Sequence, residues 1–159
     1  YAYSFEGYWK DVGTISSLWE ANMDMLGMNP QINLNDESWR IFSRHENEAP
    51  QYVGAEATVV NSSITEGCEI YGEVINSVIG AGVKIAKGAT VRDAVIMSGV
   101  VIGENAKIEY SIIDSGVVVG NGASVGKAKD TAKGITVVGM GVKIPDNKVI
   151  GDDEMITNI

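Results

Sequence analysis

From residue 53 onward, aliphatic and polar positions alternate with a six-residue period. Each hexad begins with Val or Ile, often followed by Gly, and carries a small residue at its fifth place. The best examples are residues 53–58, 79–84, 85–90, 102–107 and 119–124. A longer repeat lies over the hexads: Asn76-Ser77-Val78-Ile79, Asp93-Ala94-Val95-Ile96 and Tyr110-Ser111-Ile112-Ile113 start 17 residues apart, and Asn61-Ser62-Ser63-Ile64 starts 15 residues before the first.

The double period predicts a coil with three sides. Two six-residue sides and one five-residue side add up to the 17-residue repeat. Each side is a short strand whose aliphatic residue points inward and stacks on its equivalent in the next coil, while Gly and Asn occupy the corners. Backbone hydrogen bonds then run between coils, so no coil is stable alone. We therefore expect a mainly β chain whose residues 53–159 form a single-stranded parallel β-helix.

One polar stretch interrupts the repeat. Residues 127–134 contain three lysines and no aliphatic hexad position, which predicts a loop that protrudes from the coil. The pattern resumes at Ile135 and ends near the acidic run 152–154. Cys68 lies inside a repeat and is expected to be a small buried residue.

Residues 1–52 follow different rules. Tyr1, Tyr3 and Phe5 alternate with polar or small residues, which predicts a half-buried strand. Thr14 is placed to cap a helix that ends near residue 28, where Gly27 is a natural stop. Its apolar positions have helical spacing: Ile15, Leu18, Trp19 and Leu26, with Asn22 between them. We expect residues 1–28 to form a strand–turn–helix unit and residues 29–52 a connector.

Charge and hydropathy exclude several classes of function. The net charge of −9 disfavours binding to nucleic acid, which requires clusters of Lys and Arg. No apolar run approaches the roughly 20 residues that span a bilayer. One cysteine cannot form an internal disulfide, so a cytoplasmic location is expected.

Histidine is scarce for the enzymes usually built on hexad repeats. Acyl transfer to a hydroxyl or amine needs a general base such as His, and a three-His metal site needs three of them. The sequence has one histidine, His45, which lies in the connector and is expected to be an ordinary solvated residue. A role in assembly and regulation therefore remains for the coil itself.

The residues before the coil carry a more specific pattern. Tyr8-Trp9-Lys10-Asp11-Val12-Gly13-Thr14, followed by Trp19-Glu20-Ala21-Asn22, resembles a motif of glucose-1-phosphate adenylyltransferases. The segments Trp39-Arg40-Ile41 and Pro50-Gln51-Tyr52 and the coil follow in that family's order. The resemblance implies that the β-helix is left-handed and that residues 1–28 are the C-terminal remnant of an α/β nucleotidyltransferase domain. The parent enzyme would make ADP-glucose and pyrophosphate from ATP and glucose 1-phosphate for glycogen synthesis.

The same resemblance assigns two site residues. Asp11 is expected to help bind Mg²⁺, and Trp9, with Asp11, to line the glucose 1-phosphate site. From the residues alone, Asp11 could equally be a turn residue and Trp9 a packing residue. The family's Gly-rich phosphate loop, second metal carboxylate and phosphate-binding Lys have no counterpart in this sequence. No catalytic site is therefore complete here, and the chain alone is expected to be inactive.

Assembly and regulation are expected from the resemblance as well. The parent would respond to allosteric metabolites and form a homotetramer, or a hetero-oligomer with a regulatory subunit. The intact Asp11-Val12-Gly13-Thr14 favours the catalytic type of subunit. Ser115 stands where some relatives carry an activator-binding basic residue, and Lys84, Arg92 and Lys107 are interpreted as surface charges. A regulatory subunit, a hexapeptide-repeat acyltransferase and a nucleotidyltransferase for another nucleotide remain as alternatives.

Overall fold

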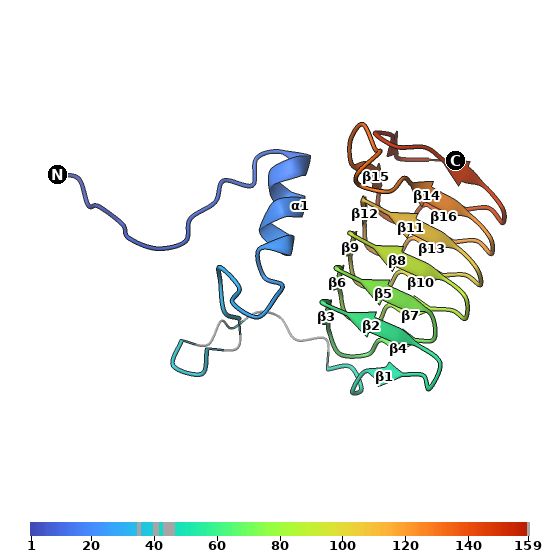
Figure 1. Cartoon of the computed structure of the whole chain (residues 1–159), viewed down its shortest axis with the longest axis horizontal. Coiled ribbons are helices and arrows are strands. Elements are labelled where there is room, and N and C mark those ends of the chain that lie inside the picture. The colour runs from blue at the N-terminus through green and yellow to red at the C-terminus, as the bar shows by residue number, and fades with distance from the viewer. Residues whose placement is uncertain (35, 40–41, 43–46, 159) are drawn as a thin grey trace.

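The computed structural model describes residues 1–34, 36–39, 42 and 47–158. Within these residues the chain forms one α-helix and eighteen short strands. His45, Arg40 and Ile41, which were discussed above, lie outside the described residues. Figure 1 shows the strands stacked as a three-sided coil, with the helix α1 beside it and the N-terminal segment extending away.

The described strands form three parallel sheets, one for each side of the coil. Sheet A contains β1 (Tyr52–Val53), β4 (Glu69–Ile70), β7 (Lys84–Ile85), β10 (Val101–Ile102), β13 (Val118–Val119) and β16 (Lys143–Ile144). Sheet B contains β2 (Thr58–Val60), β5 (Glu73–Ile75), β8 (Thr90–Arg92), β11 (Lys107–Glu109), β14 (Ser124–Gly126) and β17 (Val149–Ile150). Sheet C contains β3 (Ser63–Ile64), β6 (Val78–Ile79), β9 (Val95–Ile96), β12 (Ser111–Ile113), β15 (Thr136–Val138) and β18 (Met155–Ile156). This is the predicted fold class, a left-handed parallel β-helix.

An aliphatic column fills the coil. In sheet A, Ile70 pairs with Ile85 and Ile85 with Ile102, so residues one coil apart lie directly above one another. These three side chains have no exposed surface, and the Cys68 thiol is buried in the same cluster, as predicted. The first residue of the inner hexads (Ile79, Ile85, Ile102 and Val119) therefore points inward because the coil repeats it in register, whereas Val53 in the first coil is 46% exposed.

Glycine and asparagine occupy the corners, as the hexad pattern predicted. Asn61, Asn76 and Asp93 have positive φ angles at the corner between sheets B and C. Their side chains form a ladder, in which the Asn61 amide donates to Asn76 at 2.8 Å and the Asn76 amide donates to Asp93 at 2.6 Å. Short polar side chains tolerate the left-handed conformation because they can bond locally. Tyr110 takes the same position in the next coil with φ +41°, which is unusual for a bulky residue.

The helix α1 (Ile15–Met23) begins where predicted and ends earlier than predicted. Thr14 caps it, and a capping box joins Thr14 to Ser17. The expected end near residue 28 is wrong, because the amides of Met25 and Leu26 bond three residues back and close the last turn. Gly27 lies beyond this turn with φ +94°.

The predicted N-terminal strand is absent. Residues 1–14, all of them described, contain no strand, and Tyr1, Tyr3 and Phe5 are exposed. Alternation of apolar and polar residues predicts a strand only where a neighbouring strand accepts the backbone hydrogen bonds. No described strand of this chain pairs with this segment.

Trp19 joins α1 to the β-helix. Its side chain is 5% exposed, and its indole N–H donates to the backbone oxygen of Asp93 at 2.7 Å. The Tyr110 ring packs edge-on against it, with ring centroids 5.0 Å apart. The outward side chains of sheet C, Val95 and Ile112, are buried in the same cluster. Sheet C is therefore covered on its outer face by α1, beside which Figure 1 shows it running.

The loop between β14 and β15 completes this contact. It contains the predicted interruption at 127–134 and places the Lys129 ammonium 4.6 Å from the centre of the Trp19 ring. Such a cation–π contact adds about 0.5–1 kcal/mol at an exposed site. The same loop is held to the last coil by a hydrogen bond from the Lys133 amide to Asp152 at 2.7 Å.

Trp19→Ala should undock α1 and leave the β-helix folded. The lost packing is worth about 3–5 kcal/mol, and a helix this short is unstable by itself in water. Hydrogen exchange of the α1 amides should then accelerate by about 100-fold or more, with the coil amides unchanged. Trp19→Phe, which removes the bond to Asp93 and keeps a ring, should cost only about 1 kcal/mol. Protection of α1 that survives Trp19→Ala would refute this role of Trp19.

Candidate functional site

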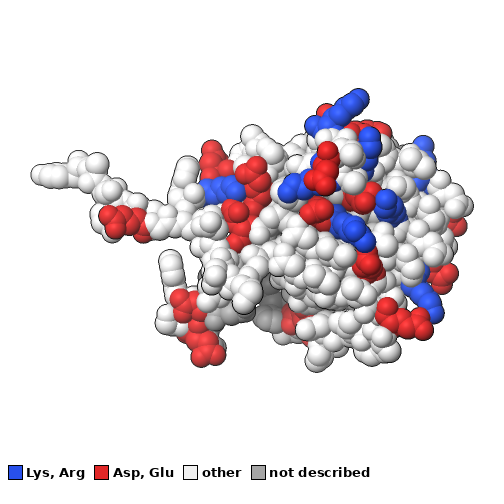
Figure 2. Space-filling view, in the orientation of Figure 1, with Lys and Arg blue, Asp and Glu red and all other residues white. Residues whose placement is uncertain are grey.

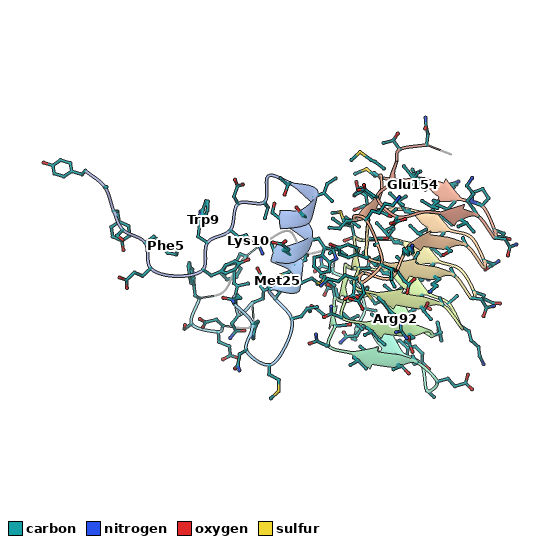
Figure 3. The ribbon with its side chains drawn as sticks, turned by 45° about the horizontal axis from the view of Figure 1, so that its top comes forward. Phe5, Trp9, Lys10, Met25, Arg92 and Glu154 are labelled. Atoms are coloured by element: carbon teal, nitrogen blue, oxygen red, sulfur yellow. The ribbon has the colours of Figure 1, made fainter. Side chains whose placement is uncertain are left out.

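The two site residues predicted from the sequence lie just before α1. Trp9 is 76% exposed, and the Asp11 carboxylate is exposed as well. Asp11 Oδ1 accepts a hydrogen bond from the Gly13 amide at 3.1 Å. This bond forms a tight turn that leads into the Thr14 cap. The structure therefore places Trp9 and Asp11 on the segment that leads directly into α1, and Figure 3 shows Trp9 on this segment before the helix.

A clamp fixes this segment to the other end of α1. Asp24 Oδ2 accepts hydrogen bonds from the Tyr8 hydroxyl at 2.9 Å and from the Lys10 ammonium at 2.7 Å. Lys10 also lies 3.2 Å from Glu20 Oε2. Since Tyr8 and Lys10 flank Trp9, their bonds to Asp24 set the path of the backbone through Trp9 and towards Asp11. We call Tyr8, Lys10, Glu20 and Asp24 the carboxylate clamp.

Electrostatics stabilise the clamp. The hydrogen bond from Lys10 holds the pKa of Asp24 below its ordinary value, and the bond to Asp24 raises the pKa of Lys10. The pKa of Tyr8 is raised, first by desolvation and then by its bond to Asp24. All three shifts favour the state in which Asp24 is charged, Lys10 is charged and the Tyr8 hydroxyl keeps its proton.

Sequence reasoning missed the clamp although a signal was present. Tyr8 and Lys10 are two residues apart, so in an extended segment their side chains leave the backbone on the same side, and Trp9 leaves on the other. Asp24 lies four residues after Glu20, on the same face of the helix end. The spacing thus groups Tyr8 with Lys10 and Glu20 with Asp24. Whether these two pairs meet depends on the turn at Asp11–Gly13, which the spacing does not determine.

The clamp and the β-helix contact involve different residues of the same helix. Asp24 and Glu20 hold the segment that bears Trp9 and Asp11, while Trp19 is buried against the coil. The candidate metal carboxylate is thus connected to the β-helix by a continuous set of packed and hydrogen-bonded groups.

Metal binding by this chain would rely on Asp11 with other partners. Among the described residues, no three His, Cys, Asp or Glu side chains come close enough to form a metal cluster. Mg²⁺ is commonly held by one or two carboxylates together with phosphate oxygens and water. An exposed carboxylate at the Asp11–Gly13 turn fits that requirement as one ligand.

Three basic residues of the coil, Lys84, Arg92 and Lys107, are paired surface charges, and their surface position was predicted. Lys84 lies 2.7 Å from Glu69, Lys107 lies 2.9 Å from Glu109, and Arg92 pairs with Glu73. On the face shown in Figure 2, acidic and basic side chains are interspersed over the coil. Ser115, at the corner after β12, donates its amide to the Asp114 carboxylate at 2.6 Å.

Comparison with known proteins places the coil in a family. A family profile described as "GlmU-like, C-terminal hexapeptide" matches residues 49–142, which is more than half of the chain. The chain belongs to the GlmU-like C-terminal hexapeptide family. The match extends from the end of the connector to the β15–β16 corner, so the family's repeat accounts for most of the coil.

Curated relatives of this hexapeptide chain share one name. A glucose-1-phosphate adenylyltransferase of Geobacillus stearothermophilus is 55% identical over 92 residues, 58% of this chain and 24% of that protein. One of Desulforamulus reducens is 52% identical over 94 residues, 59% of this chain and 24% of that protein. One of Bacillus mycoides is 55% identical over 93 residues, 58% of this chain and 25% of that protein. The matched region thus spans about a quarter of the length of these relatives.

The helix of this hexapeptide-family chain has nine residues, and no helix among the described residues has the length and apolarity needed to cross a membrane.

The pH dependence of the clamp follows from the pKa directions. Asp24, whose pKa is lowered, contributes stability above its unfolded pKa of about 3.9, and this is lost as the pH falls through the folded value. Lys10, whose pKa is raised, contributes stability below about 10.4 that is lost as the pH rises through the folded value. Side-chain NMR titration should therefore find the pKa of Asp24 below the ordinary range for an aspartate.

Asp24→Asn is the matched variant for this measurement. The amide oxygen still accepts from Tyr8, but the charge facing Lys10 is gone, so the pKa of Lys10 should fall towards its ordinary value. An Asp24 that titrates at or above the ordinary value, or a Lys10 that does not respond to the variant, would show that the clamp does not form in solution.

Proposed function

We propose that this chain is the C-terminal part of a glucose-1-phosphate adenylyltransferase that forms ADP-glucose and pyrophosphate from ATP and glucose 1-phosphate for glycogen synthesis. The observation that carries the proposal is the 52–55% identity of the coil region to enzymes of that name. The motif Tyr8–Thr14 supports it independently, because it lies outside the repeat and resembles the same enzymes. The nucleotide donor is tested directly by an assay that compares ATP, GTP and UTP.

Asp11 is proposed as one residue that would hold the Mg²⁺ of the parent enzyme. Its carboxylate is exposed and fixed by the Gly13 amide, and the clamp holds the backbone before it. When bound, the metal would neutralise charge on the phosphates during transfer. Trp9 is proposed to line the glucose 1-phosphate site, where an aromatic face can pack against the sugar ring.

The β-helix is proposed to carry regulation and subunit contacts. Its support is the physical connection through Trp19, which ties the coil to the helix that follows Asp11. A shift of the coil that an allosteric metabolite causes would be transmitted to the site through this connection. Subunit contacts are expected in a homotetramer or in a complex with a regulatory subunit.

An acyltransferase is the less favoured function. Residues 53–159 contain no histidine, so the coil lacks the usual general base. The Cys68 thiol is buried, and burial raises its pKa, which removes it as a nucleophile.

The test is an adenylyltransferase assay on the full-length protein with Asp11→Asn beside the wild type. Asn keeps an oxygen that accepts from the Gly13 amide, so the turn survives while the metal-binding charge is lost. Outer-shell partners of metals already cost about 10–100-fold when removed, so this direct ligand should cost at least about 100-fold in activity and raise the Mg²⁺ requirement.

Glu6→Gln is the matched control, because it removes an exposed carboxylate five residues away. It should leave activity unchanged. Full activity of Asp11→Asn would show that Asp11 is a turn residue and not a metal ligand. An inactive wild type with an otherwise folded structure would assign the chain to the regulatory class of subunit.

A further inference from the structure

The second coil has a shortened corner between sheets A and B. Four residues, 54–57, separate β1 from β2, and four residues, 86–89, separate β7 from β8. Only Tyr71 and Gly72 separate β4 from β5. The strands on both sides stay in register, since Ile70 pairs with Ile85 and Glu73 with Thr90. The two residues by which this coil is shorter are therefore both absent from the corner. This corner is set back from the equivalent corners of the first and third coils.

Gly72 forms the floor of this inset. A Cβ atom at Gly72 would lie 2.3 Å from the backbone oxygen of Ala89 and 2.9 Å from that of Ala86. The shortened corner thus passes directly against the corner of the third coil, and only glycine allows this approach. The result is a surface notch with a volume of about 480 Å³.

An ion pair and an aromatic ring border the notch. Lys87, from the third coil, lies 2.7 Å from Glu56 of the first coil, so this pair bridges the inset second coil. Tyr71 is 43% exposed, and its ring packs against Tyr52 with centroids 5.7 Å apart. The Tyr71 hydroxyl donates to Glu69 at 3.3 Å, which fixes the ring by its edge.

The remaining lining is polar and rich in hydrogen-bond acceptors. It includes Thr58, Glu73, Thr90, Glu104 and Asn105. With Glu56 and Lys87, the lining carries three carboxylates and one ammonium, a formal charge of −3 + 1 = −2. Arg92, outside the lining, pairs with Glu73 and brings the local charge to −1, so the notch stays negative. A negative lining disfavours phosphate and carboxylate ligands. No metal-binding cluster occurs among the described residues, which disfavours a cation site.

Neutral saccharides match these groups. Their hydroxyls donate to carboxylate and amide oxygens and accept from Lys and Thr, while the apolar face of the sugar ring packs on an aromatic ring. The volume lies in the range of about 300–1,000 Å³ found for small-molecule sites. We propose that the notch at Tyr71 binds a neutral oligosaccharide, with one sugar ring against Tyr71 and its hydroxyls on the surrounding carboxylates.

The proposal does not depend on the adenylyltransferase reaction, and its test is a binding experiment. Maltotriose and cellotriose are titrated separately into the full 159-residue chain, with NMR of the Tyr71, Thr58 and Thr90 backbone amides as the readout. At least one trisaccharide should give saturable shifts confined to the notch. Inorganic phosphate at the same concentrations should give none.

Tyr71→Ala should weaken that binding by about tenfold or more, because the stacking surface is lost. Tyr71→Phe keeps the ring and should bind within a few-fold of the wild type. Tyr3→Ala, which removes an exposed tyrosine far from the coil in sequence, is the matched control and should change nothing. Thermal unfolding of each variant checks that the coil remains intact.

No saturable binding of either trisaccharide would overturn the proposal. Binding that is indifferent to Tyr71→Ala in a folded variant, or phosphate shifts at the notch, would overturn it too.

Discussion

The register between coils is the constraint on which this structure depends. Each strand inside a sheet hydrogen-bonds to the strands one coil before and after it, and each end strand pairs on one side; the inward Ile and Val side chains stack along the same direction. A shift of one residue in any strand would turn an aliphatic residue outward and break the column. Changes in coil length are therefore confined to the corners. The described coil contains three such changes: the shortened corner at Tyr71–Gly72, the loop between β14 and β15, and one extra residue in the corner between β17 and β18.

The corners consequently carry what is individual about this β-helix. Strand positions repeat the same few residues, whereas the corner between sheets B and C changes from Asn76 to Asp93 to Tyr110. Asp93 supplies the backbone oxygen that accepts the Trp19 indole N–H, and Tyr110 supplies the ring that packs against Trp19. The half-buried Tyr110 ring packs against Trp19 of α1, and this packing offsets the cost of its left-handed backbone.

The helix α1 owes its stability to its surroundings. Its nine residues are too few for a stable isolated helix, so the Thr14 cap, the carboxylate clamp and the Trp19 contact act together. Each connects a different part of the molecule to the same helix. The turn at Asp11, the clamp at Asp24 and the coil at Asp93 are therefore joined through α1, although 82 residues separate Asp11 from Asp93.

The sequence alone determined the features that depend on a local period: the hexads, the coil, the Gly and Asn corners, the Thr14 cap and the burial of Cys68. It also contained an unused signal, since apolar pairs such as Val95-Ile96 and Ile112-Ile113 are typical of strands buried on both faces. The roles of Trp9 and Asp11 stay predictions, because ligand contacts join groups that no local pattern relates. Only the tertiary structure decided that residues 1–6 form no strand, that α1 ends at Met23, and that Trp19 meets Asp93 and Tyr110. The physical reason is that a repeat specifies its own neighbours, whereas a helix face or a lone strand is stabilised by partners far away in the sequence.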